Sequence, residues 1–256
     1  MPEKKKRRRL RRYSFLLTFF VIAALVFLLI FTSGLFFKIS EIRVEGVTVS
    51  NPREIIELTG FSYGDNIFLI NKVAAVRAII AGMPYARAVR IKRELPGTVV
   101  VILTEAAPAA MIEYRGIYWM FDSQGKLLEP APLLSAPKMP VVKGMSLLDP
   151  MPGTTLYPAF EDTAKLDPLL ELLRAMQEAL VWEDTGEIDI SQLSNVRFTY
   201  AEKYRVEMGT PEALGQKFQI MLLALEQEQV SGRGPGTLYL GDAADNKPVR
   251  FVPDGN

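Results

Sequence analysis

The chain contains neither histidine nor cysteine, so it lacks the side chains that most often serve as general bases, thiolate nucleophiles and soft metal ligands. The stretch Ser135-Ala136-Pro137-Lys138 matches the S-x-x-K nucleophile motif of penicillin-binding enzymes. That chemistry needs the serine at a helix start with the lysine one turn later, whereas Pro137 lies in a proline-rich stretch. No K-T-G partner motif occurs in the chain. We therefore interpret the match as chance.

Other catalytic patterns are equally weak. The sequence holds no G-x-G-x-x-G or Walker A motif. A carboxylate pair for sugar hydrolysis stays open, because the chain has 29 Asp and Glu residues and their pairing depends on the fold. We predict no catalytic residue, cofactor or metal site, and keep a membrane-anchored cell-wall enzyme, working by acyl transfer or hydrolysis, as an alternative.

A basic run leads directly into a long apolar stretch at the N-terminus. Eight Lys and Arg residues lie between Lys4 and Arg12, and the 23 residues from Phe15 to Phe37 carry no charge. A helix of that length covers about 34 Å, which is enough to cross a hydrocarbon core of about 30 Å. The sequence predicts a basic cytoplasmic tail over residues 1–14 and a transmembrane helix over residues 15–37.

Two other interpretations of this segment were weighed. A cleavable signal peptide has a shorter apolar centre and small residues at its cleavage site, whereas this stretch ends in Gly34-Leu35-Phe36-Phe37. A nucleic-acid arm needs support elsewhere, but beyond the first 12 residues 22 basic side chains face 28 acidic ones, a net charge of −6. We therefore predict an uncleaved anchor in contact with membrane lipid and no nucleic-acid partner. By the positive-inside rule, the remaining chain lies outside the cytoplasm.

The 70 residues after the anchor show a readable order of elements. "KISEIRVEGV" alternates as a strand with Ile42 and Val44 inward. A helix is expected from Asn51-Pro52 to Gly60, and a second one from Asn71. Residues 86–93 and "TVVVILTE" read as strands, and the apolar run of the latter predicts a central position. The second helix is expected to bury one face, made of Val73, Val76, Ile79 and Ile80.

The rest of the chain is expected to be rich in strands. A hairpin turn is predicted at residues 122–125, and seven prolines between residues 130 and 158 predict extended loop. Two short strands, residues 237–240 and 248–252, close the chain. One helix is expected to bury Leu169, Leu172, Leu173, Met176 and Leu180, and a later one, starting at Thr210-Pro211-Glu212, to bury Leu214, Phe218, Met221, Leu222 and Leu225.

The β-α-α-β-β order directly outside a membrane helix resembles a POTRA domain. The stretches "PAAMIEYRGIYWMFDSQGKLLE", "EIDISQLSNVRFTYAEKYRVEMGTPEALGQKFQIMLLALEQE" and "GTLYLGDAADNKPVRFVP" resemble the second domain of the FtsQ/DivIB family of bacterial cell-division proteins. The resemblance implies a single membrane helix and an α+β ectodomain: a POTRA domain over residues 38–106, then a mixed, mainly antiparallel β-rich domain with helices on one face over residues 107–252. Residues 253–256 would form a C-terminal tail.

The same resemblance implies a function without chemistry. The chain would be a single-pass type II scaffold of the division machinery at the septum, in the cell (inner) membrane, with its C-terminal domain extracytoplasmic. Its implied partners are small FtsB/DivIC-like and FtsL-like proteins and the septal wall-synthesis machinery. A POTRA-bearing export component is the other alternative, although such proteins continue into a barrel or pore.

Two sheet edges are the candidate binding sites. An edge strand has unpaired N–H and C=O groups that a partner strand can use. The resemblance places the partner at the terminal strands, where Phe251 is either an apolar anchor for the partner or a contact of the chain's own sheet; the "GDAADNK" turn leaves the register open. On the POTRA edge strand the cations either prevent unwanted pairing or attract an acidic segment. The terminal set is Leu238, Tyr239, Leu240, Val249, Arg250, Phe251 and Val252, and the POTRA set is Arg87, Arg90, Lys92 and Arg93.

Overall fold

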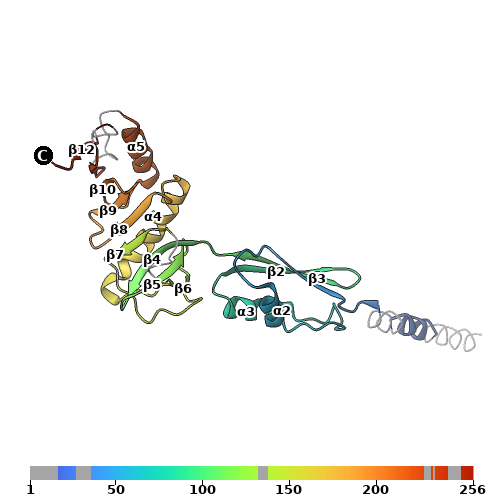
Figure 1. Cartoon of the computed structure of the whole chain (residues 1–256). Coiled ribbons are helices and arrows are strands. Elements are labelled where there is room, and N and C mark those ends of the chain that lie inside the picture. The colour runs from blue at the N-terminus through green and yellow to red at the C-terminus, as the bar shows by residue number, and fades with distance from the viewer. Residues whose placement is uncertain are drawn as a thin grey trace, which may run out of the picture. The chain divides into compact units, whose positions relative to one another are not determined.

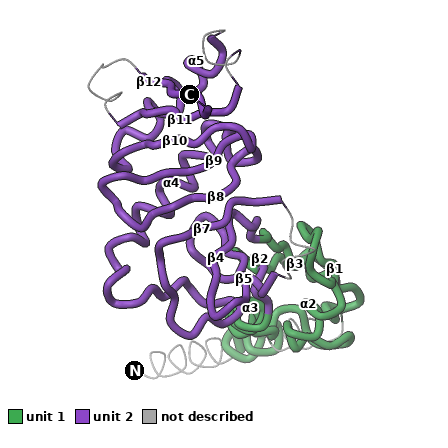
Figure 2. The backbone as a smooth tube through the Cα atoms, turned by 60° about the vertical axis from the view of Figure 1, so that its left-hand side comes forward, with its two compact units in different colours: residues 1–82, 86–105 green, residues 83–85, 106–256 purple. Residues whose placement is uncertain are grey.

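A computed structural model of the chain describes residues 17–26, 36–131, 138–227, 232, 234–241 and 249–255. Residues 17–26 are helical, and the rest of the predicted membrane span up to residue 35 lies outside the described residues, as does Ser135. Within the described ranges, no helix is both long and apolar enough to cross a bilayer. The chain divides into two compact units: residues 1–82 with 86–105, and residues 83–85 with 106–256 (Figure 2).

From residue 36 onward, the described part of the first unit is a three-stranded sheet with two helices. Its elements are β1 (Glu41–Glu45), α2 (Pro52–Thr59), α3 (Lys72–Gly82), β2 (Ala86–Glu94) and β3 (Thr98–Glu105). The strand order is β1-β3-β2, in which β3 runs parallel to β1 and antiparallel to β2. The two helices lie side by side along one side of the strands (Figure 1). The predicted β-α-α-β-β order and the central position of β3 are confirmed.

The start and end of α2 follow directly from its sequence. The Asn51 side chain accepts a hydrogen bond from the Arg53 amide at 3.0 Å, and Pro52 occupies the first helical position. Such a cap is worth about 1 kcal/mol relative to alanine. The helix ends where Gly60 adopts a φ of 65°, a left-handed conformation that glycine takes without steric cost. Ile55, in the middle of the helix, is completely buried.

The buried face of α3 matches the predicted one only at Ile79. Ala75 and Ile79 are buried against the sheet, whereas Val73 is 62% exposed and Ile80 39% exposed. Apolar residues occupy nearly every position of this helix, so the sequence pattern could not fix which face turns inward.

A carboxylate holds the connection between β1 and α2 at the end of β3. The Glu105 side chain accepts hydrogen bonds from the Thr48 amide at 2.7 Å, the Thr48 hydroxyl at 2.6 Å, the Val49 amide at 3.0 Å and the Ser50 amide at 2.8 Å. Partial burial alone would raise the pKa of Glu105. The hydrogen bonds from Ser50, Thr48 and Val49 outweigh that effect and lower the pKa to about 2, because they favour the charged form.

The described residues of the second unit form one mixed sheet of nine strands. The strands are β4 (Pro108–Tyr114), β5 (Ile117–Asp122), β6 (Leu127–Ala131), β7 (Val141–Lys143), β8 (Thr185–Asp189), β9 (Val196–Tyr200), β10 (Tyr204–Gly209), β11 (Gly236–Tyr239) and β12 (Arg250–Pro253). Their order is β12-β11-β10-β9-β8-β7-β4-β5-β6. The pairs β4–β7, β7–β8 and β10–β11 are parallel and the other five are antiparallel, so the predicted mixed, mainly antiparallel sheet is confirmed.

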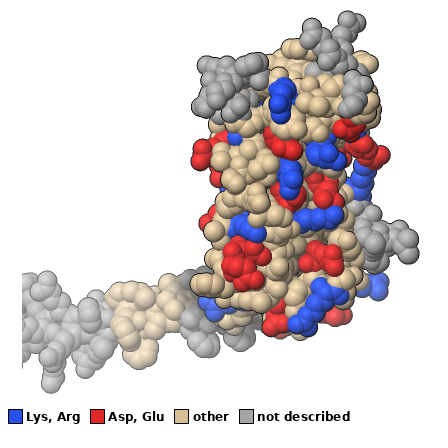
Figure 3. Space-filling view, turned by 90° about the vertical axis from the view of Figure 1, so that its left-hand side faces the viewer, with Lys and Arg blue, Asp and Glu red and all other residues tan. Residues whose placement is uncertain are grey.

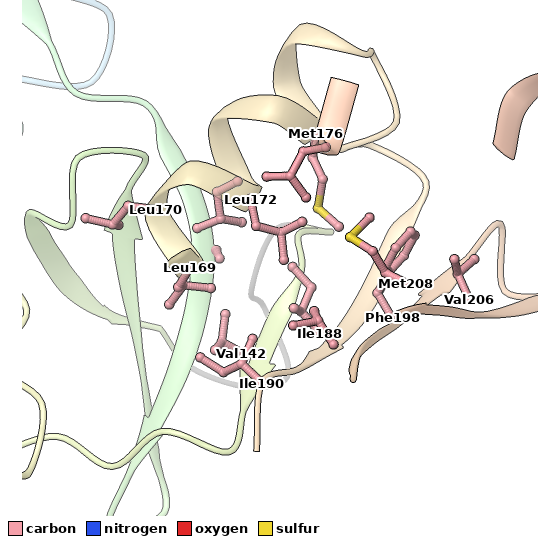
Figure 4. Close-up of a cluster of buried hydrophobic side chains, with 14 of the residues drawn as sticks. Val142, Leu169, Leu170, Leu172, Met176, Ile188, Ile190, Phe198, Val206 and Met208 are labelled. Carbon is pink, nitrogen blue, oxygen red and sulfur yellow. The ribbon is translucent and has the colours of Figure 1, made fainter. Parts of the chain in front are cut away.

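The core of this unit lies between the sheet and the helix α4 (Leu166–Glu178), which follows the short 3-10 helix η1 (Phe160–Lys165). The α4 residues Leu169, Leu172 and Met176 point at strand residues such as Ile188 and Phe198 (Figure 4). The predicted stripe on this helix is confirmed up to Met176. Leu180, however, follows the helix with a φ of 57° and is 86% exposed, because the chain has already turned away from the core.

The second helix of this unit, α5 (Leu214–Glu226), begins four residues later than the sequence predicts. Lys217 explains the difference: it is only 1% exposed, and its amine donates to the carbonyls of Met208 at 3.0 Å and Thr210 at 2.7 Å. The Thr210 carbonyl is therefore bound by a side chain rather than by a first helical turn. Leu214, Phe218 and Met221 are buried as predicted.

Candidate functional site: two sheet edges

The last strand of the chain forms one border of the nine-stranded sheet. Among the described residues β12 pairs only with β11, opposing Gly236 with Pro253, Thr237 with Val252, Leu238 with Phe251 and Tyr239 with Arg250. β11 is itself held by β10, through bonds from the Gly236 amide to Lys203 at 3.3 Å and from the Leu240 amide to Glu207 at 2.7 Å. The described part of the chain therefore ends in a strand with one unpaired side.

The hydrogen bonds also show which amides of β12 face outward. The Asp254 amide donates to the Pro235 carbonyl at 2.9 Å, and residues of antiparallel strands exchange bonds at every second pair. The amides of Val252 and Arg250 therefore point to β11, whereas those of Phe251 and Val249 point away from it. Pro253 has no amide hydrogen to offer. The free border thus presents two donors close together, at Val249 and Phe251.

The side chains of this border divide between two faces. Phe251 lies on the core face, half-buried, with its ring centroid 6.2 Å from that of Tyr204. Leu238 and Leu240 are completely buried and pack in the core beneath this face of the sheet. On the open face, the Arg250 guanidinium lies 4.2 Å from the centre of the Tyr239 ring and Val252 is 42% exposed. A partner can therefore touch Tyr239, Arg250 and Val252, and the exposed part of Phe251.

Gly236 makes the close packing of Phe251 possible. A Cβ atom at this position would lie 2.5 Å from the Val252 carbonyl oxygen and 2.6 Å from the Phe251 ring, which is closer than side chains approach in folded proteins. We did not predict this residue to matter for the edge. The run Gly232-Arg233-Gly234-Pro235-Gly236 could have suggested it, since glycine inside a strand often marks a close approach.

The face of the sheet that carries Arg250 has acidic and basic side chains in equal number around a groove. A shallow groove over β8, β9 and β10 is lined by two acids and two arginines, together with Phe198 and Thr199: the charged residues are Glu187, Asp189, Arg197 and Arg205. Asp189 accepts from the Arg197 guanidinium at 2.7 Å. Partial burial would raise the pKa of Asp189, but hydrogen bonds from Ser191 and Arg197 lower it. Figure 3 shows such mixing of Lys and Arg with Asp and Glu over one face of the molecule.

The second candidate edge is β2 in the first unit, which among the described strands pairs only with β3. The structure does not bring its four cations together. Arg90 and Lys92 are exposed and oppose Ile102 and Val100 on the face away from the helices. Arg93 turns to the helix face, where its guanidinium donates to the Phe68 carbonyl at 3.3 Å, and Arg87 lies at a register shift near the start of the strand.

Comparison with known proteins identifies the relatives of this chain. Residues 37–106 match the family of POTRA domains of the FtsQ type. The chain is 27% identical over 203 residues to the cell-division protein DivIB of Clostridium acetobutylicum, which covers 78% of each chain. These matches make the chain similar to the FtsQ/DivIB cell-division proteins. Residues 37–106, the matched segment, are here called the POTRA domain, and the second unit is called the β-rich domain.

Two further similarities cover shorter parts. The chain is 34% identical over 89 residues to the cell-division protein FtsQ of Corynebacterium glutamicum, a match that spans 35% of this chain and 40% of that protein. The major extracytoplasmic domain of DivIB from Geobacillus stearothermophilus, in its trans isomer, matches with 19% identity and a TM-score of 0.30, over 45% of this chain and 87% of that one.

Proposed function

We propose that this FtsQ/DivIB relative is a single-pass membrane scaffold of the bacterial division machinery. The anchor would be the apolar stretch of residues 15–37, with the N-terminal tail in the cytoplasm and both folded units outside the membrane at the septum. The proposal gives the chain no chemistry of its own. Its task would be to gather small single-pass proteins of the FtsB/DivIC and FtsL types and, through them, the septal wall-synthesis machinery.

The observation that carries this proposal is the free border of β12. A strand of an incoming protein can pair with the outward amides of Val249 and Phe251, extending the sheet by β-augmentation. The rigid support behind the border favours such pairing, because Leu238 and Leu240 are completely buried and fix β11 in place. Arg250, stacked on Tyr239, and Val252 would then contact side chains of the added strand.

The β2 border of the POTRA domain is the second place where we propose binding. Arg90 and Lys92 project from the same face of this strand, where they would attract an acidic segment and repel a basic one. The same charges also discourage a second copy of β2 from pairing. We therefore assign the main partner to β12 and a charge-selective contact to β2.

Proline at position 249 tests the proposed strand addition. Val249→Pro removes one outward amide while leaving the bonds between β11 and β12 intact, so capture of the FtsB/DivIC-like partner by the full chain in membranes should be lost. Deleting residues 247–256 should have the same effect. Co-purification from solubilised membranes measures both.

Val249→Ala is the matched control. It shortens the same side chain and keeps the backbone amide that proline removes, so it should retain most of the capture. If Val249→Pro binds as well as the unmodified chain, or if Val249→Ala loses binding to the same extent, the partner does not recognise the backbone of β12.

A further inference from the structure

One end of the POTRA domain presents large apolar side chains to solvent. We call it the Lys38 end, and it consists of residues 36–38, the loop 66–70 and the β2–β3 turn at residues 94–97. Its exposed residues are Phe36 (72%), Phe68 (47%), Leu69 (82%) and Leu95 (60%). Exposed apolar residues that gather in this way usually mark an interaction site.

At this end, the loop 66–70 and the β2–β3 turn each bond to the segment of residues 37–40. The Ile67 amide donates to the Phe37 carbonyl at 2.9 Å, and the Phe37 and Phe68 rings meet edge to face with centroids 5.2 Å apart. The turn is held just as firmly, because the Ser40 amide donates to the Gly97 carbonyl at 2.9 Å. The exposed tips of both segments therefore stand beside the point where the chain enters the domain.

Cations accompany these apolar tips. Lys38 is exposed, and the Arg93 guanidinium donates to the carbonyls of Phe68 at 3.3 Å and Ile70 at 3.5 Å. Two acids lie nearby, but the Asp65 carboxylate accepts from the Ser62 amide at 2.9 Å and Glu94 lies 3.8 Å from the Arg43 guanidinium. Apolar tips next to Lys and Arg suit the boundary of a bilayer, where acyl chains meet anionic headgroups.

We propose that the Lys38 end docks onto the outer surface of the membrane, with Leu69 and Leu95 entering the lipid headgroup layer. This inference rests on the proposed anchor at residues 15–37. Phe37 is the last apolar residue of that anchor, so its carbonyl lies at the edge of the hydrocarbon. The headgroup layer is about 5–8 Å deep on each side. A loop that is bonded to Phe37, with a ring 5.2 Å from its own, therefore lies within this layer.

The opposite end of the same domain provides a matched reference. Val49 is 65% exposed, and its amide is held by Glu105 at the far end of β3. β3 starts next to Gly97, and eight residues of strand at about 3.3 Å each place Val49 roughly 25 Å from the turn. Val49 and Leu69 are both largely exposed, at 65% and 82%, but only Leu69 is expected to contact lipid.

The absence of cysteine allows a direct experiment with single labels. The full chain is reconstituted into vesicles of phosphatidylethanolamine and phosphatidylglycerol, with an environment-sensitive fluorophore on Leu69→Cys, Leu95→Cys, Val49→Cys or, within the anchor, Leu25→Cys. All four side chains are exposed in the structure, so none of the substitutions opens a cavity in the core. Nitroxide lipids labelled near the headgroup should quench the probes at positions 69 and 95 several-fold more than the probe at 49, with a matching blue shift.

The probe at position 25 tests the proposed anchor separately from the proposed docking of the Lys38 end. If position 25 is quenched by deep nitroxides but positions 69 and 95 behave like 49, the anchor stands and the docking is refuted. If position 25 is not quenched either, the proposed anchor fails and the docking fails with it. A blue shift at 69 without quenching by lipid would mean that protein covers this surface, which also overturns the proposal.

Discussion

The two candidate borders, β2 and β12, differ in what they offer to an incoming strand. β2 has nine residues and displays Arg90 and Lys92 on one face, so charge opposes a strand of the same kind. β12 has four residues, ends at Pro253 and has a single exposed cation, Arg250, which stacks on Tyr239. A partner at β2 would be selected by its charge, whereas a partner at β12 would be selected by its ability to pair with two backbone amides.

The largest effect should come from Gly236→Ala, which removes the β12 border and leaves β2 intact. The new methyl group collides with the Val252 carbonyl and the Phe251 ring, at a cost of about 1–3 kcal/mol for crowding a packed site. We expect the amides of Thr237 and Tyr239, which point towards β12, to exchange their hydrogens about tenfold faster or more. Hydrogen exchange followed by mass spectrometry measures this change.

Gly215→Ala is the control for that experiment. Gly215 lies in α5 and a Cβ atom there would meet nothing within 4 Å, so alanine should leave the border unchanged and stabilise the helix by about 0.4–1 kcal/mol. Equal exchange in Gly236→Ala and the unmodified chain would show that the close approach of Phe251 does not hold β12.

Glu105→Gln should have the next largest effect, and only on the POTRA domain that carries β2. The folded pKa of Glu105, about 2, lies below its ordinary value of 4.5, so the carboxylate adds stability above about pH 4.5. That contribution is lost as the pH falls from about 4.5 towards 2. Since the group is partly solvated, we expect a loss of about 1–2 kcal/mol at neutral pH.

Thermal unfolding of the solubilised chain at neutral pH and at about pH 3 checks this expectation. Glu105→Gln should melt earlier at neutral pH and should differ less from the unmodified chain in acid. Glu57→Gln, an exposed position on α2, is the control and should change neither curve. If Glu105→Gln is as stable as the unmodified chain at neutral pH, the hydrogen bonds from residues 48–50 to the Glu105 carboxylate contribute little to stability.

The smallest effect on stability, under about 0.5 kcal/mol, is expected from Arg90→Thr combined with Lys92→Thr, because both side chains are exposed. The double variant is informative because it tests whether these charges prevent self-association through β2. If charge keeps β2 unpaired, the double variant should self-associate at lower concentration in sedimentation velocity, while Arg53→Thr on α2 should not. Unchanged association would assign these cations to partner selection alone.

Local chemistry in the sequence predicted much of the fold. Asn51, Pro52 and Gly60 set the bounds of α2 because their preferences act within a few residues. The apolar run in β3 predicted a central strand because both of its faces are covered, with Val99, Val100 and Val101 each at most 1% exposed. The border position of β12 followed only from the resemblance to a family, since nothing local tells the last strand of a sheet from the one before it.

The errors arose where distant groups decide the outcome. Lys217 reads as a surface residue of an amphipathic helix, yet it is buried because two carbonyls at the end of β10 bind its amine. Arg93 was named as a candidate contact of the β2 edge, but its guanidinium binds the loop carbonyls of Phe68 and Ile70 on the helix face. Gly236 was missed because the ring that it accommodates comes from a strand about 15 residues later in the chain.

The parallel pairing of β1 with β3 has a mechanical consequence. The chain enters the POTRA domain at Lys38, just before β1, and leaves it at Glu105, where β3 ends. Tension applied between these two points pulls the neighbouring strands lengthwise past each other, so all the bonds of the shared register, from Glu41–Thr98 to Glu45–Ile102, resist at once rather than one after another. A domain threaded in this way transmits force without unzipping.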